Sequence, residues 1–215
     1  YGLNKACYIP LGHKNFKCLK KNDVLKKVKP ILEDPSIKKI GQNIKFDYIV
    51  LKQNNIDVEP IEDTMLISYV LDAGINRHNL DTLSEIHLGH KTILYKDLVG
   101  AGKKQLNFSD IELDKATEYA AEDADVTFRL YEYLKSRLDN EKLNKVYEIF
   151  EKPMVKLLSQ IEMNGIKVDD LCLKKLSKKF KNKLIKIESK IFSLAGKDFN
   201  IASPKQLGEI IYNEL

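Results

Sequence analysis

The chain has 215 residues and a formal net charge of +5, and 43% of its residues are hydrophobic. This composition excludes a collagen, a disordered acidic tail and a membrane protein, since no apolar run approaches the ~20 residues that a spanning helix needs. The three cysteines, Cys7, Cys18 and Cys172, are scattered without a Cys-x-x-Cys pair. This pattern argues against a disulfide framework or a zinc cluster, and a reducing cytoplasm is the expected location.

The first part of the chain has the pattern of alternating strands and helices. Residues 5–11 are short, apolar and end at a Pro-x-Gly break, which predicts a strand. A helix capped by Asn22 or Asp23 comes next and is expected to stop near Asp34. Residues 37–41 are a second short strand candidate.

Helices dominate the residues between 44 and 139. Apolar side chains at helical spacing predict two of them, one at Phe46, Ile49 and Val50 and the other at Met65, Leu66, Tyr69 and Val70. Thr82 with Glu85, and Ser109 with Glu112, fit capping boxes. Residues 112–139 contain no Gly or Pro and carry an apolar stripe, which predicts a long helix.

The composition changes near residue 140, where we place a domain boundary. Residues 1–140 have an α/β pattern, whereas residues 141–215 have a purely helical one with a C-cap signal at Gly165. In the helix expected after Gly165, apolar residues recur at steps of three and four, which suits a long antiparallel pair of helices. Ser203 and Pro204 open a last helix as N-cap and first helical residue.

Lysines gather between residues 171 and 190, where eight of them accompany a single acid, Glu188. One interpretation is a solvated helix face. The other is a surface that contacts phosphates, because clustered lysines attract polyanions through counterion release.

Two pairs of polar residues are candidates for chemistry. The first pair, Asn43 and Asp47, comes after the second strand, and the second pair, Tyr119 and Asp123, lies in the long helix. The two residues of each pair are four positions apart in the sequence. Members of each pair therefore share a helix face. Carboxylates on separate elements with a tyrosine suit metal-assisted phosphoryl hydrolysis, in which oxygen ligands favour Mg²⁺ or Mn²⁺. Each pair alone occurs often by chance, so the wider arrangement has to decide.

Four segments in their order and spacing resemble the proofreading exonuclease domain of bacterial family A DNA polymerases. They are residues 41–47 (GQNIKFD), 62–71 (EDTMLISYVL), 77–83 (RHNLDTL) and 119–127 (YAAEDADVT). Residues 153–169 and 199–207 are similar to the start of the polymerase region and to the segment after its thumb helices. The resemblance implies a ribonuclease-H-like α/β exonuclease fold with a central mixed sheet, then thumb-like helices, in a bacterial, nucleoid-associated protein.

The resemblance also implies site residues. Asp47 matches the second exonuclease motif and Asp123 the third, whose carboxylates hold two Mg²⁺ or Mn²⁺ ions, and Tyr119 matches the residue that positions the attacking water. The first motif, Asp-x-Glu, is expected upstream of Tyr1. Without it we expect residues 1–215 alone to bind metal poorly and to hydrolyse DNA slowly or not at all. The polymerase catalytic aspartates are likewise expected further along the parent protein, which we expect to be monomeric.

Further residues match positions that contact DNA. Gln42, Asn43 and Arg77 fall where the family binds the frayed 3′ end of single-stranded DNA, and Met65 and Tyr95 fall near its terminal bases or sugars. For Tyr95 a half-buried loop aromatic is an equal alternative to base stacking. For Arg77 the alternative is a surface ion pair. Duplex DNA is expected near residues 171–190, and no membrane partner is expected.

Two other functions remain open. One is a ribonuclease-D-like or helicase-linked exonuclease that acts on RNA or structured DNA, against which the thumb-like residues 153–215 argue. The other is a catalytically silent DNA-binding scaffold, against which the presence of Asp47, Tyr119 and Asp123 argues.

Overall fold

The computed structural model describes residues 5–213, which fall into two compact units, Tyr1–Asn164 and Gly165–Leu215. The domain boundary predicted near residue 140 lies inside the first unit, because Tyr147 and Val155 belong to that unit's hydrophobic cores. A division between two domains near residue 140 stays a prediction. The outer ends of the two predicted domains, at residues 1–4 and 214–215, lie outside the described part of the chain.

The first unit contains a small parallel sheet. Strand β1 (Lys39–Gly41) pairs with β2 (Ile61–Asp63), and helix α2 (Ile44–Gln53) provides the crossover that parallel strands need. In register, Lys39, Ile40 and Gly41 pair with Ile61, Glu62 and Asp63. The side chains of a strand alternate between faces, and the two faces accordingly contact two different cores.

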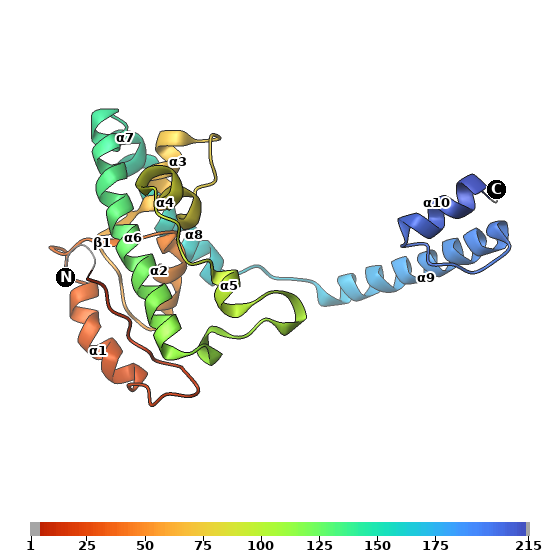
Figure 1. Ribbon diagram of the computed structural model, residues 1–215, viewed down its shortest axis with the longest axis horizontal. Coiled ribbons are helices and arrows are strands. Elements are labelled where there is room, and N and C mark those ends of the chain that lie inside the picture. Colours follow the sequence, from red (N-terminus) through yellow and green to blue (C-terminus); the bar gives the residue numbers. More distant parts are fainter. Residues whose placement is uncertain (1–4, 214–215) are drawn as a thin grey trace. The chain divides into compact units, whose positions relative to one another are not determined.

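The core on one face is built around the long helix α6 (Leu113–Asn140), which packs against β1, α3 (Thr64–Asp72) and α4 (Leu80–Leu88) (Figure 1). The buried side chains of this core are Ile67, Leu83, Val126, Leu130, Tyr131, Leu134, Leu138 and Tyr147. Those of α6 recur mostly at steps of three or four, so that one stripe of the helix faces the sheet.

The core on the other face lies between α1 (Lys21–Leu32), α2 and α8 (Lys152–Asn164). Its buried side chains are Ile44, Tyr48, Ile56, Val58, Ile61 and Val155. The remaining elements of the first unit are α5 (Tyr95–Val99), η1 (Gly102–Lys104), η2 (Phe108–Asp110), α7 (Asn144–Val146) and the π-helical segment η3 (Tyr147–Glu151). The α/β fold class with subsequent helices is therefore confirmed, although the sheet within residues 5–213 is parallel and not mixed.

The second unit consists of helices α9 (Asp170–Ala195) and α10 (Pro204–Asn213). The Asp169 carboxylate caps α9 through the Cys172 amide at 2.9 Å. The last helix begins at Pro204 as predicted. The long antiparallel pair predicted for the helices on either side of Gly165 stays a prediction, because α8 and α9 belong to different units.

Three local predictions were wrong. Residues 5–11 form no strand, because no described segment pairs with them. Asn79, not Thr82, is the N-cap of α4, since Leu80 already packs against the core. Ser109 lies in η2, and α6 begins only after Glu112.

The first helix also departs from its predicted start. Lys20 occupies the N-cap position of α1 without a side-chain hydrogen bond, in place of Asn22 or Asp23. The helix expected over residues 112–139 agrees with α6 to within one residue, whereas strand β2 was not predicted from the sequence. Among residues 5–213 no helix is both long and apolar enough to cross a bilayer.

Candidate active site

A cavity of about 570 Å³ opens beside the C-terminal end of β1. Its polar lining comes from the β1–α2 turn, α2, the start of α4 and the middle of α6. These side chains are Gln42, Asp47, Asp81, Tyr119, Asp123 and Thr127. The structure therefore brings Asp47, Tyr119 and Asp123 to one cavity, although Asp47 is far from the other two in sequence.

Tyr119 and Asp123 lie one turn apart on α6, so the phenol and the carboxyl group are neighbours in the lining of the cavity. Burial raises the pKa of Asp123 to about 6, and the negative charges of Glu122 and Asp81 add to the rise. The pKa of Tyr119 is raised too, first by burial and then by the neighbouring Asp123 carboxylate. The phenol therefore stays protonated at neutral pH.

Asp47 lies in the first turn of α2. Its side chain is exposed at the cavity rim, yet surrounding protein displaces enough water to raise the pKa of its carboxyl. The turn that leads into α2 requires glycine at position 41, because a Cβ there would lie 2.9 Å from the Ile44 Cβ. Asn43 takes a left-handed conformation with φ 57°, which asparagine tolerates better than most residues.

Of the residues predicted to bind DNA, Gln42 lines the cavity. Its amide nitrogen donates to the His78 carbonyl oxygen at 2.7 Å, and its amide oxygen accepts from the Thr64 hydroxyl. The amide is therefore held in one orientation. Asn43 is exposed at the adjoining turn and is not part of the lining.

The other three predicted DNA contacts lie outside the lining. Arg77 is exposed in the loop before α4, and Met65 is partly buried in the first turn of α3. Tyr95 is 45% exposed, and its ring lies 6.0 Å from the Tyr119 ring and 6.3 Å from the ring of Phe108. Tyr95 therefore belongs to an aromatic group beside the cavity, which leaves both interpretations of it open.

Two acidic residues of the site were missed from sequence. Asp81 lines the cavity and accepts the Thr92 hydroxyl at 2.8 Å. Glu122 accepts the Ile93 amide at 2.7 Å and lies 2.8 Å from His90, which fixes the loop before α5. Asp81 and Glu122 each lie in a segment that carries the family resemblance. The resemblance therefore covered these residues but assigned them no role.

The donors of the cavity fit part of a divalent-cation site. Asp47 and Asp123 supply carboxylate oxygens, the ligands that Mg²⁺ and Mn²⁺ prefer. Within residues 5–213 no three His, Cys, Asp or Glu side chains are grouped closely enough to hold a metal ion. A site that holds two metal ions would therefore need further ligands.

Known proteins resemble this chain in sequence and in fold. A family model described as 3′-5′ exonuclease matches residues 2–139. The chain is 45% identical to DNA polymerase I of Rhizobium leguminosarum, with 98% of this chain and 22% of that protein covered. It is 42% identical to DNA polymerase I of Pseudomonas aeruginosa, with 98% and 24% covered. The chain thus spans about a quarter or less of the length of these curated relatives.

A solved structure shares the fold. It is the POL domain of Pol1 from M. smegmatis in complex with DNA primer-template and dNTP, with a TM-score of 0.66 and 21% identity. The match covers 93% of this chain and 31% of that one. Helices after residue 139 are included in that coverage, so the similarity extends beyond the exonuclease residues.

Proposed function

The chain belongs to the 3′-5′ exonuclease family of the family A DNA polymerases, and we propose that it is the proofreading part of a DNA polymerase I. In this proposal its cavity hydrolyses the terminal phosphodiester of single-stranded or frayed DNA. The observation that carries the proposal is the meeting of Asp47, Tyr119 and Asp123 at one cavity.

Asp47 and Asp123 would hold Mg²⁺ or Mn²⁺ together with the Asp-x-Glu motif of the full-length protein. Bound divalent ions would supply positive charge that stabilises the negative charge on the attacking and leaving oxygens. Tyr119 orients the attacking water, and its raised pKa keeps the hydroxyl neutral, so it acts as a hydrogen-bonding group rather than as a base. The Asp123 carboxyl group, one turn further along α6, lies beside that hydroxyl in the lining of the cavity.

Gln42, Asn43, Arg77, Met65 and Tyr95 would bind the 3′-terminal nucleotides. Gln42 uses one amide hydrogen on His78, so the second hydrogen is available to the DNA. Tyr95 offers an exposed ring next to Tyr119, where a base could stack.

The proposal is tested with the full-length protein, because the reaction also needs the Asp-x-Glu motif. A 5′-labelled single-stranded DNA and an RNA of the same sequence are incubated with Mg²⁺, and shortening from the 3′ end is monitored. We expect stepwise shortening of the DNA. Preferred shortening of the RNA would support the ribonuclease-D-like alternative, and no shortening of either strand would support the silent scaffold.

Tyr119→Phe is expected to slow this DNA shortening by about 10–100-fold, because the water loses a group that orients it. The Mg²⁺ concentration for half-maximal rate should stay unchanged, since the ligand Asp123 remains. Tyr133→Phe on the same helix is the matched control, because Tyr133 contacts His87 and not the cavity. A wild-type rate for Tyr119→Phe would remove Tyr119 from the mechanism.

Helix α9 is proposed to contact duplex DNA, because its lysines between residues 171 and 190 are all exposed. Replacing Lys174, Lys175, Lys178 and Lys179 with glutamine should flatten the slope of log affinity against log salt by about two to four. Four exposed lysines serve as the control, namely Lys20, Lys21, Lys26 and Lys27 near α1, and their replacement should leave the slope unchanged. An equal slope in both variants would favour a solvated helix face.

A further inference from the structure

The Asp63 carboxylate serves the N-termini of two helices at once. Asp63 ends β2 and is 2% exposed. Its side chain accepts the amide of Met65 at 2.9 Å, which caps α3. The same carboxylate also accepts the amides of Asn43 at 3.1 Å and Ile44 at 3.0 Å, at the start of α2.

These bonds hold the turn that shapes the cavity. The turn, residues 41–44, supplies Gln42 to the lining and begins the helix whose first turn carries Asp47. The Thr64 hydroxyl, next to Asp63, shares its one hydrogen between the Gln42 amide oxygen and the Gly41 carbonyl oxygen, which lies 3.1 Å away. Two consecutive side chains at the end of β2 and the start of α3 therefore fix the turn.

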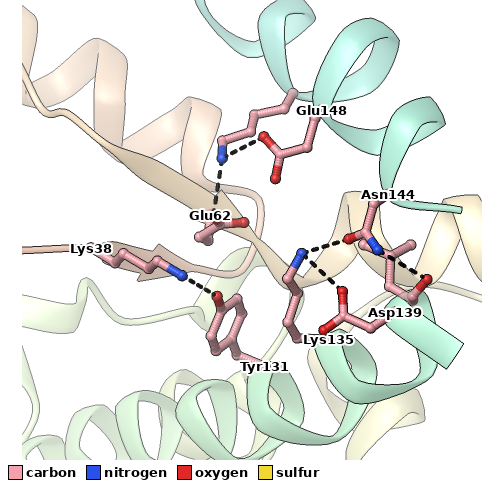
Figure 2. Close-up of polar contacts among 9 residues, drawn as sticks. Lys38, Glu62, Tyr131, Lys135, Asp139, Asn144 and Glu148 are labelled. Carbon is pink, nitrogen blue, oxygen red and sulfur yellow. Dashed lines mark hydrogen bonds and ion pairs between the residues drawn. The ribbon is translucent and has the colours of Figure 1, made fainter. Parts of the chain in front are cut away.

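Residues that follow the range 2–139, which the family model matches, also bind the end of β2. The Tyr147 hydroxyl accepts the Asp63 amide at 2.9 Å, and Tyr147 is fully buried. The Lys152 ammonium group donates to the carboxylates of Glu62 in β2 and Glu148 in η3, each at 3.0 Å. Figure 2 labels the two glutamates and marks both contacts with dashed lines. The position of Asp63 thus depends on η3 and α8.

We propose that Asp63 is a positioning residue for the exonuclease reaction, which rests on the function proposed above. It does not line the cavity, so it acts through the turn. By binding three amides of two helices, it sets where Gln42 and Asp47 stand relative to Tyr119 and Asp123. A misplacement of about 1 Å at such a site is enough to slow a reaction on the order of 100-fold.

The test is Asp63→Asn in the full-length protein. Asparagine keeps the shape but replaces one acceptor oxygen with an amide donor, which must face at least one of the three backbone N–H groups. We expect kcat for shortening of single-stranded DNA to fall about 10–100-fold well below the unfolding temperature, while primer extension is unchanged. Hydrogen exchange of residues 41–47 should accelerate.

Leu138→Ala is the matched control. Leu138 is fully buried at the other end of α6, so its truncation destabilises the first unit without touching the turn. We expect it to lower the unfolding temperature and to leave kcat unchanged. If Asp63→Asn folds poorly, Tyr147→Phe removes only the hydroxyl that accepts the Asp63 amide, and it should show the same pattern with a smaller loss.

The outcomes separate the two proposals. Wild-type kcat and unchanged exchange at residues 41–47 in both Asp63→Asn and Tyr147→Phe would overturn the role of Asp63 alone. An equal loss of kcat in Leu138→Ala would also overturn it, because the effect would track stability. Failure of the unsubstituted protein to shorten DNA would overturn the proposed function and this role with it.

Discussion

Asp123→Ala in the full-length protein is expected to lower Mg²⁺-dependent shortening of single-stranded DNA by at least about 100-fold. Asp123 would be a metal ligand in the middle of α6, and the loss of a partner that merely orients such a ligand already costs about 10–100-fold. The substitution also removes the carboxyl group that lies beside Tyr119 in the lining of the cavity. Single-turnover rates on a 5′-labelled strand measure the effect.

Asp139→Ala is the control for this prediction. Asp139 lies near the end of the same helix, where it pairs with Lys135 at 3.5 Å, away from the cavity. We expect its rate to equal that of the unsubstituted protein. Full Mg²⁺-dependent activity in Asp123→Ala would show that this carboxylate has no part in the reaction.

Asp123→Asn is expected to stabilise the metal-free chain at pH 8 by about 2–3 kcal/mol, since each pKa unit corresponds to about 1.4 kcal/mol. The pKa of Asp123 rises from 3.8 to about 6 on folding, so the folded state holds this proton more tightly. Stability from the protonated carboxyl is fully present below the unfolded pKa and is lost as the pH rises through the folded one. Asparagine cannot ionise and so avoids the loss.

Urea unfolding with EDTA at pH 4 and pH 8 measures this effect. The free energies of unfolding of the two proteins should be close at pH 4 and differ at pH 8, with Asp123→Asn the more stable. Asp139→Asn, which replaces an exposed carboxylate near the end of the same helix, is the matched substitution for comparison. A gap that is absent at pH 8, or larger at pH 4, would contradict the buried, charge-crowded setting of Asp123.

Both predictions concern a site whose carboxylates lower the stability of the metal-free protein. The cavity gathers Asp47, Asp81 and Asp123, and the pKa values of Asp47 and Asp123 are raised chiefly by burial. Carboxylates in such a place destabilise the metal-free protein and are useful only when a cation is bound. Such a conflict between stability and activity is common at functional sites.

The sequence predicted those features that depend on neighbours along the chain. The apolar stripe of α6 and the spacing of Tyr119 and Asp123 on it are local, and the structure has both. The strand expected at residues 5–11 depends on a pairing partner, which local pattern does not reveal. The N-caps at Asn79 and Glu112 depend on how Leu80 and η2 pack. The two capping-box patterns therefore predicted the wrong helix starts.

The second role of Asp63 shows the same limit. Its cap on Met65 is local, since Met65 lies only two residues further along the chain. Its bonds to Asn43 and Ile44 span about twenty residues and exist only because β1 and β2 lie side by side. Asp81 joined the cavity for a similar reason, through the packing of α4 on α6.

The most direct measurement is anomalous diffraction from crystals of the full-length protein grown with Mn²⁺ and a single-stranded oligonucleotide. We predict a manganese peak about 2.1 Å from a carboxylate oxygen of Asp123, the distance usual for small hard cations, with the 3′ end of the strand beside Tyr119. A 3′ end bound away from this cavity, with no manganese at Asp123, would contradict the assignment.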